Sequence, residues 1–370
     1  MRKLSLFALM IALSLPLCGC QVSGEVENQA YVLVLAIDQG DDGGLILTAR
    51  VPRIGKGGMK SREGESEGSP YLTFSVSAPT WPAALDTLQW ATPRRVNLSH
   101  IEMLVVSEAL ASQPSFLGLM NQISDTPHLY TNVRFVVCSG SAKSFLEAGE
   151  TVIGTRLSSE IRAMLSQYAH QGYIPDAGFA DACYTANGIY GDPVAIWGYT
   201  DAQSPSDNDG GAVVESPMRQ RFSGAALFQG GSFIHALTSR QTRLLNLIRG
   251  QISELPYEWR GETFDLSVDA SPRRWMNIEE GSVSLALNLR FHVPDGISDA
   301  DAALLERAVD GDIERLIGLC QQLDCDPFGF AESAAAHFPT VSQWLAFDFH
   351  ARYRDAPLEV EVRIERGHGT

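Results

Sequence analysis

The chain has 370 residues, of which 45% are hydrophobic and 19% are charged; these proportions are ordinary for globular protein, and the length allows two or three domains. Its 28 basic and 44 acidic residues give a net charge of −16, so the chain as a whole repels nucleic acid and anionic lipid headgroups. This excess of acidic residues argues against nucleic-acid binding and against membrane binding through a cluster of basic residues.

The first twenty residues have the pattern of a bacterial lipoprotein signal. Arg2 and Lys3 precede an apolar run over Leu4–Leu17, which is shorter than the roughly 20 residues that cross a bilayer. The run ends in Leu17-Cys18-Gly19-Cys20, which places Leu at −3 and Gly at −1 relative to Cys20. We therefore predict a signal peptide over residues 1–20 and lipid attachment at Cys20, which anchors the chain to the outer side of a membrane. The alternative is an ordinary secretory signal.

A β-hairpin is predicted next. Ala30–Asp38 and Leu45–Pro52 are rich in strand-forming residues, and the Gly- and Asp-rich stretch between them is a hairpin signature. The acidic turn could also suggest a calcium loop, but Ala49 stands where such a loop needs Glu. The hairpin is the favoured interpretation.

The rest of the first block alternates strands and helices. In order, the sequence predicts a loop over 54–70, a strand over Tyr71–Ala78, a helix from Thr80 to Gln89, buried strands over Ile101–Ser107 and Val133–Cys138 with helical sequence between them, and an amphipathic helix over Thr155–Gln171. This order predicts a mixed sheet covered by helices, in an N-terminal domain spanning residues 21–199.

A polar stretch over 200–217 predicts a linker before a small middle domain, residues 200–260. This domain is expected to hold a hairpin (Phe222–Phe228 and Phe233–Leu237) and a helix (Ser239–Arg249). The C-terminal domain, residues 261–370, is expected to hold strands over Phe264–Val268 and Val283–Val293, helices over Ser298–Leu323 and Phe330–His337, and an alternating strand over Leu358–Arg366. The predicted fold class is α+β, with three mixed α/β domains in series, each a small β-sheet packed with helices.

Four cysteines lie beyond the signal: Cys138, Cys183, Cys320 and Cys325. So few cysteines in a large chain do not predict a disulfide framework. Cys320 lies on the apolar stripe of the long helix, which favours a buried thiol; a Cys320–Cys325 disulfide is the alternative. No CxxC motif or close histidine pair predicts a zinc site.

Motifs of catalysis are missing from the sequence. It holds no GxSxG, HExxH, Walker or dinucleotide-binding pattern, and its eight histidines are dispersed. His100, just before a strand, is best interpreted as a structural histidine. The prediction is a protein that is not an enzyme, with no catalytic residue, no cofactor and no metal.

Four segments together resemble the Ger(x)C family, the lipoprotein C subunits of nutrient germinant receptors in spore-forming bacteria. They are Ala30–Asp38 with its Gly-rich turn, Ser99–Glu108, Gly224–Gly231, and the C-terminal series Asp326-Pro-Phe-Gly-Phe330, Pro339, Trp344 and Val360–Gly367. They occur in the family's order and span nearly the whole chain. The sequence departs from the family pattern after Cys20, where Gln21-Val22-Ser23 replaces the common start, and at Ala331, where a second Gly is common.

The resemblance implies a lipoprotein anchored through Cys20 at the outer surface of the spore inner membrane, where it assembles with A and B type membrane subunits in spore germination. It implies no catalytic residue. Two other classes remain as hypotheses: an extracytoplasmic solute-binding lipoprotein of a transporter, with a cleft between two lobes, and a surface-tethered hydrolase, which the missing motifs disfavour.

Overall fold

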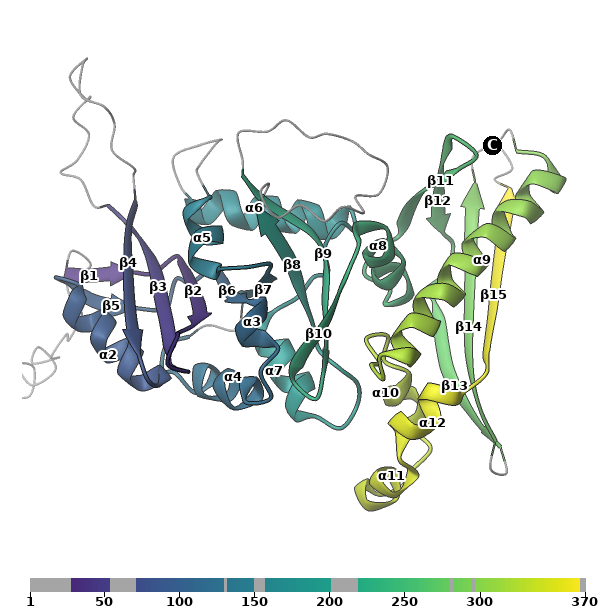
Figure 1. The fold of residues 1–370 in the computed structure, drawn as a ribbon. Helices are drawn as coiled ribbons and strands as arrows, with labels where there is room; N and C mark the ends of the chain where they lie inside the picture. The colour runs from purple at the N-terminus through teal and green to yellow at the C-terminus, as the bar shows by residue number, and fades with distance from the viewer. Residues whose placement is uncertain are drawn as a thin grey trace, which may run out of the picture.

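A computed structural model describes residues 28–53, 71–129, 132–149, 157–200, 219–279, 282–293 and 297–366. The predicted signal with Cys18 and Cys20, the predicted loop over 54–70, the stretch 201–218 and Gly367 lie outside these residues. Figure 1 shows the described chain as two bodies side by side, each with its own β-sheet.

The N-terminal body is built on an eight-stranded mixed sheet in the order β10-β9-β8-β7-β6-β2-β3-β4. Its strands are β2 (Val34–Gln39), β3 (Leu45–Pro52), β4 (Tyr71–Ala78), β6 (Met103–Ser107), β7 (Arg134–Cys138), β8 (Val194–Thr200), β9 (Gln220–Gln229) and β10 (Ser232–Leu237). The four central strands, β2, β6, β7 and β8, run parallel, and the outer strands join them antiparallel. A small parallel pair, β1 (Gln29–Tyr31) with β5 (Arg95–Asn97), lies at the far end of this body.

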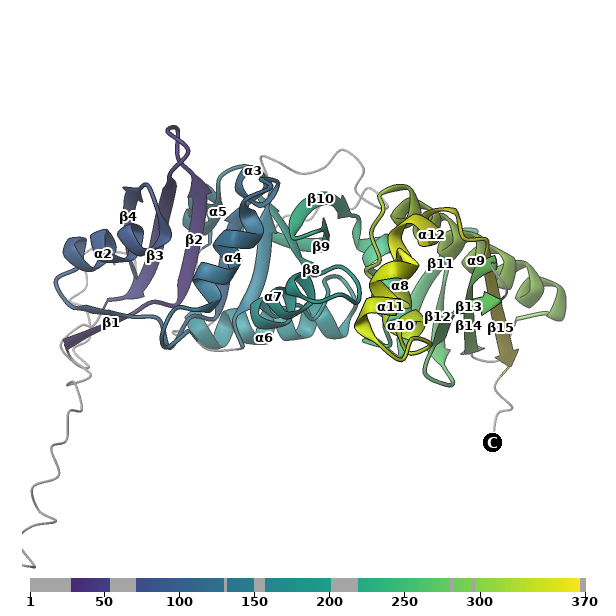
Figure 2. The same ribbon diagram turned by 90° about the horizontal axis from the view of Figure 1, so that it is seen from below.

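Helices cover both faces of the large sheet (Figure 2). On one face pack α2 (Trp81–Ala91), α3 (Glu108–Ala111), α4 (Phe116–Ser124) and α7 (Phe179–Asn187); on the other pack α5 (Ala142–Glu147) and α6 (Leu157–His170). Strands buried on both faces read as continuous apolar runs, which is why β6 and β7 contain almost only apolar residues.

The C-terminal body holds a five-stranded sheet in the order β11-β12-β14-β13, with β15 paired to β14. The strands are β11 (Glu254–Trp259), β12 (Glu262–Val268), β13 (Arg273–Glu279), β14 (Ser282–Val293) and β15 (Leu358–Arg366). The helices are α8 (Ser239–Ile248), the long α9 (Asp299–Gln322), α10 (Phe330–Ala335), α11 (Val341–Phe347) and α12 (Phe349–Asp355). One apolar cluster runs from Val194 and Leu227 in the large sheet, through Leu245 on α8, to Ile313 on α9.

The α+β class and the series of sheets are confirmed, and the predicted elements lie within a few residues of their expected positions. The thiol of Cys320 is buried on α9 as predicted, and both Cys320 and Cys325 are free, so the disulfide alternative is wrong. In the turn between β2 and β3 the Gly40 N–H donates to the Gly44 carbonyl and the Gly43 N–H donates to the Gly40 carbonyl, which confirms the hairpin.

Strands on either side of 201–218 belong to the same sheet, because β8 and β9 are antiparallel neighbours. The first two thirds of the predicted middle domain therefore extend the N-terminal sheet, and α8 lies between the bodies (Figure 1). The three-domain division stays a prediction. Among the described helices, none combines the length and the apolar character that a membrane crossing requires.

Candidate functional site

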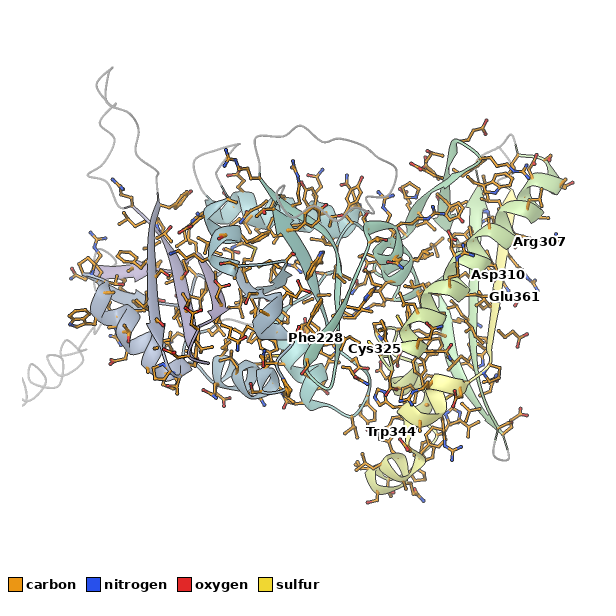
Figure 3. The ribbon with its side chains drawn as sticks, in the orientation of Figure 1. Phe228, Arg307, Asp310, Cys325, Trp344 and Glu361 are labelled. Atoms are coloured by element: carbon orange, nitrogen blue, oxygen red, sulfur yellow. The ribbon has the colours of Figure 1, made fainter. Side chains whose placement is uncertain are left out.

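The two bodies are fastened together along the segment Asp324–Asp326, which we call the seam. Each of its three residues bonds to the N-terminal body. Asp324 Oδ2 accepts from Gln229 Nε2 at 3.0 Å, and Cys325 Sγ donates to the Phe228 carbonyl at 3.2 Å. Figure 3 shows Phe228 and Cys325 facing each other where the bodies meet.

Asp326 and Asp192 make the third connection. Asp192 lies just before β8, and its Oδ2 accepts from the Asp326 backbone N–H at 2.8 Å. The Asp192 N–H in turn donates to the Asp326 carbonyl at 3.2 Å. Because this pair uses backbone groups of both bodies, the register between the bodies is fixed at this point. Gly191 has φ +101 and approaches the Asp326 carbonyl, a position where a side chain would be strained.

The Asp326 carboxylate organises its own loop. It is 1% exposed and accepts backbone N–H groups from Phe328, Gly329 and Ala331 at 3.1, 3.0 and 2.7 Å. These donors lie at the start of α10, where free N–H groups need acceptors. Gly329 has φ +88, so the sharp turn into the helix favours Gly. The Asp-Pro-Phe-Gly-Phe motif therefore encodes a buried cap that also reaches the other body.

Burial dominates the electrostatics of the carboxylate pair. Asp192 is 9% exposed, and burial raises its pKa to about 6, with His350 opposing the shift. Burial also raises the pKa of Asp326, against the backbone N–H groups of its loop that stabilise the ionised form. The thiol pKa of Cys325 rises for the same reason, so this cysteine is an inert buried thiol rather than a nucleophile.

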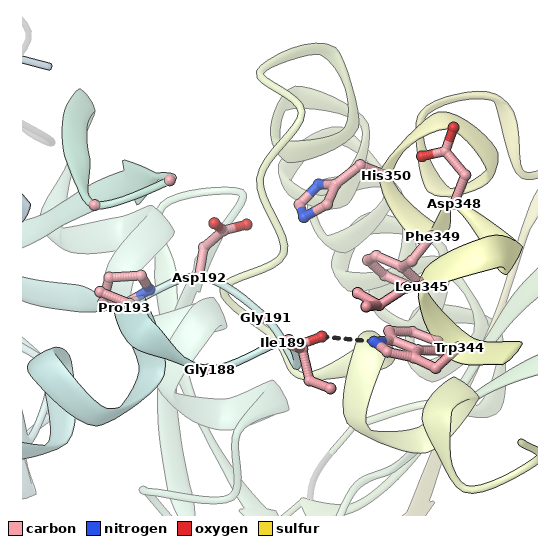
Figure 4. A pocket seen from close by; sticks show the side chains of 13 residues that line it. Gly188, Ile189, Gly191, Asp192, Pro193, Trp344, Leu345, Asp348, Phe349 and His350 are labelled. Atoms are coloured by element: carbon pink, nitrogen blue, oxygen red, sulfur yellow. Dashed lines mark hydrogen bonds between the residues drawn. The ribbon is translucent and has the colours of Figure 1, made fainter. Parts of the chain in front are cut away.

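A pocket of about 280 Å³ opens beside the seam (Figure 4). Its floor comes from residues 188–193 and from the β9–β10 turn, and its other wall from α11 and α12. Asp192 and His350 face each other across it, while Trp344 closes one side by donating from Nε1 to the Ile189 carbonyl at 2.8 Å. Carboxylates and aromatic rings together can hold a small polar or cationic molecule.

Sequence-predicted site residues do not gather at this pocket. Cys20 lies outside the described residues. His100 is exposed, bonds to the Ser99 hydroxyl at 2.8 Å and packs edge-on against Tyr31, an arrangement that contains no nucleophile–base–carboxylate series. Trp344 and Asp326, noted only as parts of the family signature, each bond to the N-terminal body, at Ile189 and Asp192 respectively.

A second polar cluster lies on the C-terminal sheet. Asp269, His292 and Glu365 each offer one ligand atom, and these atoms lie within 4.8 Å of one another. His292 on β14 stands opposite Glu365 on β15 in the strand register, and Asp269 Oδ1 lies 3.0 Å from His292 Nε2. One imidazole and two carboxylates could hold a divalent cation.

Sequence reasoning missed both the carboxylate pair and this cluster, because their members lie far apart in the chain. Two short motifs could have identified the pair Asp192 and Asp326: Gly-Asp-Pro before β8 and Asp-Pro-x-Gly before α10. An Asp next to Pro commonly accepts backbone N–H groups in a turn.

Comparison with known proteins extends these observations. The family described as "Spore germination protein N-terminal domain" matches residues 23–196, and "Spore germination B3/ GerAC like, C-terminal" matches residues 223–367. Spore germination protein KC of Bacillus subtilis (strain 168) is 24% identical over 138 residues, which are 37% of this chain and 34% of that protein. The match thus spans about a third of that relative.

A solved structure described as "Crystal Structure of the GerBC protein" has the same fold. It superposes with a TM-score of 0.54 at 12% identity and covers 90% of this chain and 96% of that one. Both family profiles, in order and over most of the chain, agree with the segments quoted above. This chain belongs to the Ger(x)C family of spore germination proteins.

Proposed function

We propose that this protein is a membrane-anchored lipoprotein subunit of a spore nutrient germinant receptor, which assembles with A and B type membrane subunits at the outer surface of the spore inner membrane. The observation that carries the proposal is the lipoprotein signal motif Leu17-Cys18-Gly19-Cys20, which we call the lipobox. It lies directly before a chain that matches the family from residue 23 onward. Two or three acyl chains on one cysteine give durable anchoring, which a single chain does not.

The role that we assign is to bind and stabilise partner subunits, not to catalyse. Three hydrogen-bonded connections at the seam and a shared apolar cluster make the two bodies one continuous surface for partners. Anchoring raises the effective concentration of a weak interface, so contacts of modest affinity are enough for assembly.

The solute-binding alternative draws on one observation, the pocket between the bodies. Solute-binding lobes have to part and close around their ligand. Here Trp344 and the Asp192–Asp326 pair join the pocket's two walls by direct hydrogen bonds, which disfavours a hinge at this place. The receptor subunit is therefore the better-supported function.

The test is a pair of substitutions in the signal region, made in the spore-forming host. Cys20→Ala should leave the protein without an acyl group and slow the germination response, because fewer receptors assemble. Cys18→Ala is the matched control and should change neither, since it leaves Leu17, Gly19 and Cys20 in the lipobox register.

Mass spectrometry of detergent-extracted protein should find an acylated N-terminal Cys20. An acyl group on Cys18, or unmodified protein in the soluble fraction, contradicts the anchoring proposal. Normal germination on every nutrient after gene deletion, together with lost uptake of one solute, would favour the transporter hypothesis.

A further inference from the structure

We propose that the end of the N-terminal body formed by β1, β5 and the last turn of α2 contacts the bilayer, with Trp90 inserted at the headgroup level and Arg94 and Arg95 facing anionic lipid. This inference rests on the proposed anchoring through Cys20 and specifies how the anchored body is oriented. The binding partner of this end of the body is a lipid surface.

Trp90 carries the first part of the argument. It is 89% exposed, the most exposed large apolar side chain of the described residues. The buried residues of α2 are Trp81, Ala84 and Leu88, and a helix turns 100° per residue. Trp90 therefore lies about 200° around the helix from Leu88 and points directly away from the core. An indole kept in water in this way contributes nothing to folding.

The position of Trp90 relative to the anchor is the second part. Seven residues separate Cys20 from Asn28, the first described residue, so the chain between these two residues spans at most about 28 Å. Asn28 leads into β1, whose Gln29 pairs with Arg95 of β5. Figures 1 and 2 show β1, β5 and α2 together at the end of the molecule farthest from the C-terminal body. A lipid on Cys20 thus holds this end beside the bilayer.

The link between Trp90 and β5 is rigid. The side chain of Gln89 donates to the Arg94 carbonyl at 3.0 Å and accepts from the Val96 N–H at 2.9 Å. Trp90 follows Gln89 directly, so its place is fixed relative to the strand that meets the incoming chain.

Two arginines, Arg94 and Arg95, are adjacent in the sequence at this end, although the whole chain has a net charge of −16. Acidic residues of the neighbouring sequence are Asp86, one turn before Trp90, and Glu25 and Glu27, between Cys20 and Asn28. Trp is enriched at membrane–water interfaces, and basic residues near a surface of anionic lipid bind it. One indole buries at most about 250 Å², far less than the roughly 800 Å² that each partner buries in a stable protein interface. A bilayer fits this small patch better than a protein does.

The experiment attaches the protein to vesicles chemically, so that it does not depend on acylation in cells. The chain from Cys20 to Thr370 is coupled through Cys20 to maleimide headgroups in vesicles of phosphatidylglycerol and brominated phosphatidylcholine. The four described cysteines are buried, which leaves Cys20 as the reactive thiol. Bromine quenches tryptophan fluorescence only where an indole enters the bilayer.

Trp90→Phe should remove most of the quenching seen with the parent chain, whereas Trp259→Phe, the matched control on β11 of the C-terminal body, should leave it intact. In chains left uncoupled by Cys20→Ser, replacing both Arg94 and Arg95 with Gln should lower partitioning onto anionic vesicles roughly tenfold or more, and leave neutral vesicles unaffected.

Equal quenching of the parent and the Trp90→Phe chain overturns the proposal. So does crosslinking in spores from position 90 to a protein instead of to lipid. Absence of acyl groups on Cys20 in cells refutes the proposed anchoring but leaves the coupled-vesicle result unchanged, so the two failures are distinguishable.

Discussion

Removing the buried cap at the seam should destabilise the protein strongly. Asp326→Ala deletes the acceptor of three backbone N–H groups, those of Phe328, Gly329 and Ala331. The bonds from Phe328 and Ala331 are buried, and the bond from Gly329 is partly buried, so water replaces the lost acceptor poorly.

The magnitude follows from the hydrogen bonds that are lost. Each buried donor without an acceptor costs about 1–3 kcal/mol, and bonds in one network do not add fully. Burial of the ionised carboxylate is itself costly, as the raised pKa of Asp326 indicates. Removing the carboxylate removes this cost and offsets part of the loss. We expect Asp326→Ala to lower the free energy of unfolding by about 3–5 kcal/mol.

Asp326→Asn separates charge from hydrogen bonding. The amide oxygen can still accept from Phe328 and Gly329, but the amide nitrogen then faces the Ala331 N–H, donor against donor. The expected loss is about 1–3 kcal/mol, smaller than for Ala.

Urea unfolding of the chain without its signal, followed by circular dichroism, measures these losses. Asp355→Ala, at an exposed position on α12, is the control and should stay within about 0.5 kcal/mol of the parent. If Asp326→Ala lies within 1 kcal/mol of the parent, or if Asn costs more than Ala, then the Asp326 carboxylate does not act as the cap described here.

Three further predictions concern the seam and the sheet beside it. Because burial raises the pKa of Asp192 to about 6, its contribution to stability is full below about pH 4 and is lost as pH rises through 6. Between pH 4 and 7 the free energy of unfolding of the parent should therefore fall by roughly 2–3 kcal/mol more than that of Asp192→Asn. If the two free energies change in parallel with pH, the pKa of Asp192 is not raised. Trp344→Phe loses the bond to the Ile189 carbonyl and should cost about 1–2 kcal/mol in urea unfolding, whereas an unchanged midpoint would mean that this bond does not stabilise the seam. Gly224→Ala should cost about 3 kcal/mol or more, since Gly224 has φ +114 and an added Cβ would lie 2.2 Å from the Leu237 carbonyl oxygen; a stably folded variant of parental midpoint would refute this.

Local patterns in the sequence were enough for most elements. The stripe through Leu305, Val309 and Ile313 predicted α9, and the alternation of Leu358–Arg366 predicted β15, because a single buried face leaves a periodic signal. Weakly patterned elements were missed: β11 contains Pro256, β13 begins with two arginines, and α11 and α12 are each only seven residues long.

The family was also readable from sequence, since its motifs are contiguous and occur in order. The lipid anchor at Cys20 stays a prediction. Which strands share a sheet was not readable from sequence. The polar stretch over 200–217 suggested a boundary, yet β8 and β9 on its two sides pair directly, because strand pairing depends on backbone hydrogen bonds that composition does not encode. Asp192 and Asp326 lie 134 residues apart, and only the docking of the two bodies brings them together. There the Asp192 carboxylate and the Asp326 backbone form a contact between the bodies, while the buried Asp326 carboxylate shapes the loop that presents this backbone.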